Sequence, residues 1–392
     1  MVSNRQLFLQ NLAQTTNFPL QLEIEKAEGV YMYAPDGKAY IDLISGIGVS
    51  NVGHRHPKVV DAVKHQIDQY MHLMVYGELV QSPQVKLAQA ITATLPPSLD
   101  QVYLVNSGSE AIEGALKLAK RYTGRAEIIS CFDAYHGSTA GALSAGGSET
   151  FKQNYRPLIP GHRNITFNSL EDLEQITEQT AAFLIETIQG EAGVRVPDAD
   201  YLKAVRKRCT ETGTLLIMDE IQSGFGRTGR FWGFEHFGIT PDIVTSAKGM
   251  GGGMPIGCFI SSKEIMSAFT ENPILGHITT FGGHPVSAAA SLATIQIIQD
   301  EKLMDGIPEK EALFRQLLVH PKIESFRSKG LMMAADFGSF ETLKKIIDKA
   351  IEGGVLTDWF LFCDNSMRIA PPLTITEEEI KKACGLILQA ID

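Results

Sequence analysis

The sequence predicts an α/β fold: a large domain with a mostly parallel sheet flanked by helices, and a smaller α+β domain made from both ends of the chain. Between residues 83 and 300, short apolar segments alternate with helical segments, the pattern of a parallel sheet with crossover helices. Before and after this region the pattern changes to a hairpin and to surface helices. We therefore expect the large domain at 58–302 and the smaller domain at 1–57 and 303–392.

The N-terminal part reads as a hairpin over residues 22–42. Its strands are expected at 22–24, 30–33 and 39–41, with a Pro-Asp-Gly turn before the last of them. Pro57 then opens a helix with one apolar face.

The alternating region supplies the remaining elements of the large domain. Helices are expected at 85–95, 109–122 and 199–212, and strands at 102–105, 127–131, 182–188, 214–218, 242–245 and 256–260. Near the C-terminus a strand surrounds residues 367–369, and Thr376 with Glu379 makes a capping box for a final helix.

Composition narrows the classes of function. The chain of 392 residues is 44 % hydrophobic and 20 % charged, as in an ordinary globular protein, and its net charge of −10 argues against nucleic acid or an anionic membrane as a partner. The five cysteines are scattered without a CxxC pair, which favours a reducing cytoplasm and argues against a metal site. No apolar run approaches the ~18 residues of a membrane span, and the start shows no signal-peptide core.

Lys248 is the residue that indicates most about function. It follows a β-branched run and precedes a glycine, and an earlier apolar run ends in Asp219 and Glu220. An amine and a carboxylate at neighbouring strand ends suit pyridoxal 5′-phosphate (PLP): the amine forms a Schiff base with the aldehyde, and the carboxylate holds the proton of the ring nitrogen. Alternation along the strand puts the two acids on opposite sides, and the sequence leaves open which of them faces the cofactor.

A phosphate site is predicted at residues 106–110 (NSGSE), between a strand and a helix. A helix N-terminus offers free N–H groups and a positive dipole end, Gly108 allows a close backbone approach, and Ser109 adds a hydroxyl group. The alternative is a plain capping box of Ser107 with Glu110, and the downstream lysine favours phosphate.

Aromatic and charged residues complete the candidate site. Tyr135 follows a strand end, where a flat ring can stack on a pyridine ring, and His136 is left open as a ligand-binding, stacking or structural residue. Glu186 and Glu191 lie at another strand end. Arg368 has the planar fork that binds a substrate carboxylate, with a structural ion pair as the alternative.

One motif points elsewhere. Residues 224–229 (GFGRTG) match the dinucleotide fingerprint GxGxxG, but the residues that follow make a poor helix, which the fingerprint requires. An NAD-dependent oxidoreductase therefore stays a minor alternative.

Together these motifs resemble the class III, or ω-type, PLP-dependent aminotransferases, most closely the acetylornithine/ornithine aminotransferase subgroup. The resemblance runs from residue 46 to residue 372 and is most specific over 216–257. It implies a fold type I homodimer with active sites at the subunit interface. By this resemblance Lys248 carries the covalent link to the cofactor, Asp219 contacts the ring nitrogen and Gln222 contacts the phenolic oxygen. Tyr135 stacks on the ring face, and the phosphate is bound by Gly108, Ser109 and, from the neighbouring subunit, Thr280. His136 and Glu186 are also implied to bind the cofactor.

The resemblance further implies that Glu191 and Arg368 form a switchable pair. When they pair with each other, a side-chain amine can enter; when Glu191 swings away, Arg368 can bind a dicarboxylate such as 2-oxoglutarate.

Four positions depart from the family pattern. Ser138 stands where the subgroup carries an arginine that anchors the α-carboxylate, and Ile47 stands where ornithine enzymes carry a tyrosine for the same task. These two changes favour a donor without an α-carboxylate at this point. Thr187 and His284 replace a proline and an asparagine, and the sequence assigns no effect to either change.

The expected function is ping-pong transfer of an amino group from an ω-amino donor, acetylornithine- or ornithine-like, to a 2-oxo acid such as 2-oxoglutarate. The alternatives are a diamine or ω-amine transaminase acting on putrescine- or 4-aminobutyrate-like donors, a same-fold aminomutase or decarboxylase, and a non-catalytic protein that keeps the fold.

Overall fold

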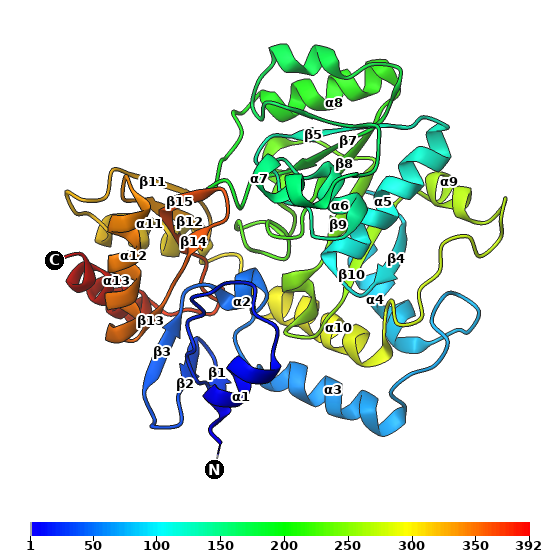
Figure 1. Cartoon of the computed structure of the whole chain (residues 1–392). Helices are drawn as coiled ribbons and strands as arrows, with labels where there is room; N and C mark the ends of the chain where they lie inside the picture. Colours follow the sequence, from blue (N-terminus) through cyan, green and yellow to red (C-terminus); the bar gives the residue numbers. More distant parts are fainter. Residues whose placement is uncertain (1) are drawn as a thin grey trace.

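A seven-stranded sheet forms the centre of the larger part of the molecule in the computed structural model, which describes residues 2–392 (Figure 1). Its strands, in spatial order, are β4 (Gln101–Val105), β10 (Gly257–Ser261), β9 (Ile243–Ser246), β8 (Leu215–Asp219), β7 (Thr180–Glu186), β5 (Glu127–Cys131) and β6 (His162–Ile165). The strands from β9 to β6 are parallel, and β10 runs antiparallel to both of its neighbours. The mostly parallel sheet is thus confirmed. Each predicted strand lies within two residues of its expected place, and β6, which has a single buried apolar residue, was missed.

Helices cover the sheet and extend below it. They are α3 (Pro57–Gln69), α4 (Ser82–Thr92), α5 (Gly108–Thr123), α6 (Ala140–Ala145), α7 (Glu149–Lys152), α8 (Tyr201–Thr212), α9 (Lys263–Met266) and α10 (Pro285–Asp300). The sequence did not predict α10. This helix packs against both α3 and α4, so most of its circumference is buried and it lacks the single apolar stripe that marks a surface helix (Figure 1).

The smaller part combines both ends of the chain. One sheet contains β1 (Lys26–Glu28), β2 (Tyr31–Tyr33), β3 (Ala39–Asp42) and β13 (Val355–Leu356); another contains β11 (Ser325–Lys329), β12 (Met332–Asp336), β15 (Cys363–Ile369) and β14 (Trp359–Phe360). The helices are α1 (Asn4–Asn11), α2 (Ser45–Gly48), α11 (Ile307–Leu317), α12 (Phe340–Gly353) and α13 (Glu377–Ile391). Because β3 pairs with β13, the N-terminal strands lie beside the C-terminal elements (Figure 1). The domain boundaries at 57 and 302 stay a prediction.

The first strand of the hairpin was placed wrongly. The sequence predicted it at 22–24, but it lies at Lys26–Glu28. The neighbouring strand β2 is only three residues long and its last residue, Tyr33, lies opposite Lys26, so residues before 25 have no strand to pair with. At the other end of the chain the predicted capping box is confirmed, since the backbone N–H of Thr376 donates to Glu379 and the N–H of Glu379 donates back.

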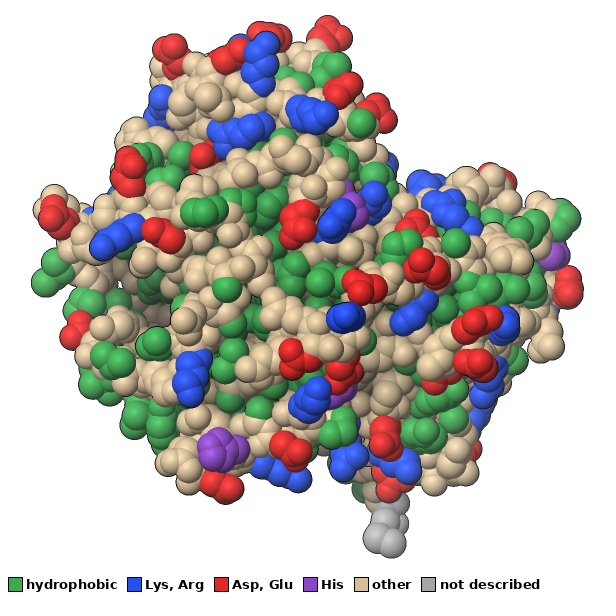
Figure 2. All heavy atoms as spheres, turned by 180° about the vertical axis from the view of Figure 1, so that it is seen from behind, with side chains coloured by type: hydrophobic (Ala, Val, Ile, Leu, Met, Phe, Trp, Pro, Cys, Tyr) green, Lys and Arg blue, Asp and Glu red, His purple; other side chains and the backbone are tan. Residues whose placement is uncertain are grey.

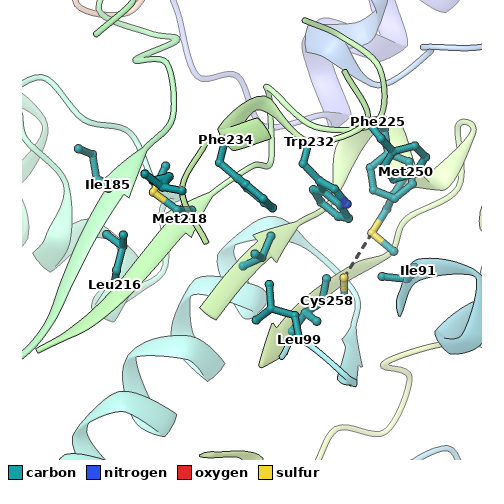
Figure 3. Close-up of a cluster of buried hydrophobic side chains, with 14 of the residues drawn as sticks. Ile91, Leu99, Ile185, Leu216, Met218, Phe225, Trp232, Phe234, Met250 and Cys258 are labelled. Carbon is teal, nitrogen blue, oxygen red and sulfur yellow. Dashed lines mark hydrogen bonds between the residues drawn. The ribbon is translucent and has the colours of Figure 1, made fainter. Parts of the chain in front are cut away.

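The GxGxxG segment does not open a helix. Residues 224–229 form turns, and the next helical element is the short 3₁₀ turn Gly233–Phe237. Aromatic residues within and after the motif are core residues: Phe225, Trp232 and Phe234 lie in a buried cluster with Met250 (Figure 3). The dinucleotide fingerprint is therefore not realised in this fold.

Arg227, at the centre of that motif, joins the two parts of the molecule. Its side chain is 1 % exposed, and its Nη2 donates to Oδ1 of Asn51 at 2.6 Å. Nη1 donates to the carbonyl groups of Leu331, at 3.1 Å, and Pro371. Burial lowers the pKa of the guanidinium to about 10. No carboxylate of residues 2–392 makes an ion pair with it, although the charge of Asp42 acts on it, so this arginine serves as a multiple hydrogen-bond donor between segments that are distant in sequence.

Replacement of Arg227 by methionine is expected to lower the free energy of unfolding by about 2–4 kcal/mol, because it leaves three buried acceptors without donors. The exposed Arg230 offers a matched control, and Arg230→Met is expected to change stability by less than about 0.5 kcal/mol. Urea unfolding of both variants measures the difference. Equal losses in the two variants would show that the buried contacts of Arg227 do not stabilise the fold.

The surface shows interspersed charge. On the face in Figure 2, acidic and basic side chains lie scattered among one another rather than in large patches of one sign. Within residues 2–392, none of the helices has both the length and the apolar character that crossing a membrane requires.

Candidate active site

A cavity of about 430 Å³ opens at the carboxyl ends of the parallel strands. The residues that line it include eight that the sequence singled out: Gly108, Ser109, Tyr135, His136, Glu186, Asp219, Gln222 and Lys248. They lie at or just after the carboxyl ends of β4, β5, β7, β8 and β9. These strands are consecutive in the sheet, except that β10 lies between β4 and β9. The predicted site residues thus lie together at one edge of the sheet.

Lys248 projects its amine into this cavity from a strained backbone. Its φ of 47° is left-handed, which costs a residue with a side chain roughly 1–2 kcal/mol. The next residue lies against Asn51, because a Cβ on Gly249 would come within 2.4 Å of its Nδ2. Protein surrounds the amine except towards the cavity; this desolvation lowers the pKa of Lys248, and no residue from 2 to 392 makes a hydrogen bond or ion pair with it. An amine with a lowered pKa and a free lone pair is a nucleophile.

Asp219 faces the cavity, which answers the question that the sequence left open. Its Oδ2 lies 2.7 Å from Nδ1 of His136, and its Oδ1 accepts the backbone N–H of Ile221 at 3.0 Å. The side chains of Asp219 and His136 are 4 % and 0 % exposed. Since an ionised carboxylate only accepts, Nδ1 of the histidine carries the hydrogen. Its Nε2 is buried without a hydrogen-bond partner in the described chain.

Glu220 points to the other side of the strand and is structural. One oxygen accepts from the Thr187 hydroxyl group, and the other accepts from Ser223 at 2.8 Å. Backbone N–H groups of Gly233 and Phe234 complete its hydrogen bonds, and burial raises its pKa to about 7. The structure thus explains one departure from the family pattern, because a proline in place of Thr187 has no hydroxyl group to donate.

The segment at the start of α5 has two unused backbone donors. The Ser107 hydroxyl accepts from the backbone N–H of Glu110 at 3.2 Å. The Glu110 carboxylate, however, accepts from the backbone N–H of Asn106 at 2.7 Å and not from that of Ser107. The plain capping box is therefore only half formed. The N–H groups of Gly108 and Ser109 donate to no acceptor among the described residues, so they remain free for an anion at the positive end of this helix.

Glu186 holds two loops of the site. It is 4 % exposed; its Oε1 accepts the N–H of Tyr135 at 3.1 Å and its Oε2 accepts the N–H of Gly190 at 2.8 Å. Burial, with a contribution from the charge of Asp219, raises the pKa of Glu186 to about 7. The Tyr135 hydroxyl lies 3.1 Å from Oγ of Ser138, at the rim of the site.

Glu191 and Arg368 form a bidentate ion pair beside the cavity. Both Nη···Oε distances are 2.9 Å, and the two residues are 2 % and 5 % exposed. Burial raises the pKa of Glu191, but Arg368 outweighs that effect and lowers the pKa to about 2. The pair does not line the cavity itself. Gln222 does, and its Nε2 donates to Oε1 of Glu191 at 3.1 Å, so it connects the pair to the cavity wall.

The departures at the donor side leave the cavity without an arginine among its lining residues in the described chain. Lys248 is the single lysine or arginine among the lining residues of the described chain. Ser138 is exposed at the rim, and Ile47 adopts a left-handed backbone with φ 65° between two glycines. Thr280 is exposed and lies outside the cavity of its own chain.

Two contacts were missed in the sequence. The bond between His136 and Asp219 joins residues after β5 and β8, which are separated in the sheet by β7, and no local pattern reveals that proximity. Asp358, in the short link between β13 and β14, contacts Arg368 and had no distinguishing signal either.

Comparison with known proteins decides the family. Residues 12–391 match the family described as aminotransferase class III. The chain is a class III aminotransferase. This aminotransferase is 39 % identical to the acetylornithine aminotransferase of Methanocaldococcus jannaschii, with 92 % of this chain and 91 % of that protein covered. It is 38 % identical to the acetylornithine aminotransferase of Bacillus subtilis, with 94 % and 95 % covered.

Solved structures agree with the family. The ornithine aminotransferase from Toxoplasma gondii ME49 superposes with a TM-score of 0.91 at 29 % identity, covering 98 % of this chain and 93 % of that one. An aminotransferase from Bacillus anthracis superposes with a TM-score of 0.93 at 26 % identity, covering 99 % and 97 %. The predicted fold of a PLP-dependent class III aminotransferase is confirmed.

The cavity fits the PLP on which class III aminotransferases depend. It presents an amine without a partner at Lys248, a buried carboxylate at Asp219 and two free N–H groups at Gly108 and Ser109. A side chain at position 137 would fill the space beside the N–H groups, since a Cβ on Gly137 would lie 2.2 Å from Oγ of Ser109.

Proposed function

We propose that this aminotransferase moves an amino group from an ω-amino donor to a dicarboxylic 2-oxo acid such as 2-oxoglutarate in a ping-pong sequence. The observation that carries the proposal is the buried Glu191–Arg368 pair, connected to the cavity through Gln222. An arginine fork held by an exchangeable carboxylate can accept a substrate carboxylate in its place, and the same pocket can take an amine when the pair is closed.

The proposed roles follow from position. Lys248 attaches the cofactor, Asp219 holds the proton of its ring nitrogen, and His136 orients Asp219 through their 2.7 Å bond. When bound, PLP supplies an electron sink for the charge that develops on the substrate carbon. Nζ of Lys248, whose pKa is lowered by desolvation, takes up and returns the proton of that carbon.

The remaining residues bind and orient. The free N–H groups of Gly108 and Ser109 bind phosphate, and Tyr135 packs on the ring face. Gln222 contacts the phenolic oxygen, and Glu186 keeps the loop of Tyr135 in place by accepting its N–H.

Two classes of donor remain for this reaction. The named relatives act on acetylornithine or ornithine, which favours an amino acid with an ω-amine. The absence of a second lining cation, in the described chain, favours a diamine or a simple ω-amine, because an α-carboxylate entering beside Ser138 finds no arginine of the same chain.

A substrate panel tests the donor class. We expect the highest kcat/KM among acetylornithine, ornithine, putrescine, 4-aminobutyrate and β-alanine to fall on a donor without an α-carboxylate, with 2-oxoglutarate preferred to pyruvate as acceptor. Ser138→Arg, which supplies the missing cation, is expected to shift the preference towards acetylornithine by about tenfold or more. Turnover that needs no 2-oxo acid would instead identify an aminomutase or decarboxylase.

We also propose a homodimer in which Thr280 reaches the phosphate site of the neighbouring subunit. The loops around Thr280 and before α4 expose large apolar side chains, including Ile274 at 74 % and Val80 at 96 %. These loops lie at the right edge of Figure 1, and apolar side chains gather at the corresponding left edge of Figure 2. Light scattering is expected to give twice the chain mass of 42.9 kDa.

A cytoplasmic location is part of this proposal and is supported by the five free cysteines.

A further inference from the structure

Arg368 contacts a second carboxylate besides Glu191. Its Nη1 and Nη2 point to Glu191, and its Nε donates to Oδ1 of Asp358 at 2.9 Å. The ring of Phe360 lies under the guanidinium, with its centroid 4.6 Å from Cζ. The planar group is therefore held at one edge, at its fork and on one face.

The two carboxylates are attached to the molecule in different ways. Asp358 lies next to Arg368 in the same sheet region: the N–H of Arg368 donates to the carbonyl of Asp358 at 2.9 Å, and the Thr357 hydroxyl donates to the carbonyl of Arg368 at 2.7 Å. Glu191 comes from the loop after β7, in the other part of the molecule. Glu191 can leave the arginine by a side-chain rotation that also breaks the bonds of its carboxylate to the N–H of Leu361 and to Nε2 of Gln222, both 3.1 Å. Asp358 is fixed beside Arg368 by the backbone bond.

We propose that Asp358 is a positioning residue that fixes the plane of the Arg368 guanidinium through Nε, so that the Nη1–Nη2 fork keeps its direction when the carboxylate of a dicarboxylic acceptor replaces Glu191. This inference rests on the dicarboxylate acceptor of the proposed function and adds the residue that prepares its binding site.

The balance of charge supports an exchange of carboxylates. With Glu191 and Asp358 ionised, one arginine faces two acids, so a third carboxylate enters only if Glu191 leaves. After the exchange Arg368 again faces two carboxylates, that of Asp358 and that of the acceptor. Without Asp358 the displaced state would retain only the Phe360 ring and the carbonyl of Trp359, 3.4 Å from Nη2, as supports for the guanidinium.

The ionised form of Asp358 is unfavourable in the folded protein. Burial, with the charge of Glu191, raises its pKa to about 6 although Arg368 acts in the opposite direction. An acid whose pKa is raised on folding contributes stability when protonated, and this contribution is lost as the pH rises from about 4 to about 6. At pH 8 a neutral asparagine is therefore expected to be tolerated without loss of melting temperature, so a binding defect in that variant reports on position rather than on folding.

The test is binding of glutarate, a dicarboxylate that cannot be transaminated, to the PLP-loaded enzyme by calorimetry at pH 8. Asp358→Asn is expected to weaken glutarate binding about tenfold or more and to keep the melting temperature. Asp358→Ala repeats the test without bringing an amide N–H next to Nε, and it serves alone if the asparagine variant does not fold. Wild-type glutarate affinity in a folded variant of either kind would overturn the inference.

Two further variants locate the effect. Asp242 makes a comparable bridge to Arg206 at 2.7 Å, with 28 % of its side chain exposed against 25 % for Asp358, and Asp242→Asn is expected to bind glutarate like the wild type. Arg368→Gln is expected to lose glutarate binding. If it loses binding while the Asp358 variants do not, the positioning role is wrong and the proposed acceptor stands. If Arg368→Gln binds glutarate like the wild type, the proposed acceptor and the inference both fail.

Discussion

Replacement of Lys248 by alanine is expected to abolish transaminase turnover, by at least about 10³-fold, and to remove the covalent link between chain and cofactor. The physical reason is that Lys248 supplies the single free amine of the cavity in the described chain, and its lowered pKa raises the fraction of that amine that carries a free lone pair.

Two measurements check this. Absorbance of the purified protein at the edge of the visible range is expected to lose the band of protein-bound PLP, and mass analysis after borohydride reduction is expected to find the adduct on Lys248 of the wild type and nowhere in the variant. The exposed Lys263 gives a control, and Lys263→Ala is expected to keep both signals. Full turnover or an intact band in Lys248→Ala would refute the assignment.

The second-largest effect is expected from Asp219→Asn. The carboxylate is 5 % exposed and already bonded to His136, so it can hold a proton on a ring nitrogen without competition from water. Loss of one partner from a buried charged pair costs about 3–5 kcal/mol, which corresponds to a turnover lower by roughly 10²–10⁴-fold. Burial of the site makes the neutral amide a poor substitute, because it can donate towards the ring nitrogen instead of accepting from it.

Glu220→Gln is the matched control for this experiment. It changes the neighbouring acid, which faces Thr187 and Ser223 on the far side of the strand, and it is expected to lower the melting temperature while kcat stays within about tenfold of the wild type. Stopped-flow measurement of the donor half-reaction and thermal unfolding separate the two effects. A larger loss of turnover in Glu220→Gln than in Asp219→Asn would reverse the roles given to these acids.

The elements that were predicted well share a physical property. The strands β5, β8 and β9 are short apolar runs bounded by turns, and a buried parallel strand needs that pattern wherever it lies in the sheet. The misses lack such a pattern: β6 has one buried apolar residue and α10 is apolar on most of its surface. The misplaced first strand shows a different limit, since pairing depends on the length of the neighbouring strand rather than on the residues of the strand itself.

The types of residue at the predicted strand ends were enough to predict most of the groups in the candidate site. An amine after one apolar run, carboxylates after two others and a glycine at a helix start are local features, and they predicted Lys248, Glu186 and Gly108 at the cavity because parallel strands all end at the same edge of their sheet. The resemblance of these motifs to the class III aminotransferases also predicted the family, which the comparisons confirmed.

The tertiary structure alone determined which way a side chain faces and which residues from distant segments are in contact. That Asp219 rather than Glu220 faces the cavity follows from which side of β8 is covered, and a strand with acids at successive positions carries no local mark of this. The contacts of His136 with Asp219 and of Asp358 with Arg368 require the order of strands in a sheet. That order arises from packing and hydrogen bonding between segments far apart in the chain, so the residues of any one segment cannot specify it.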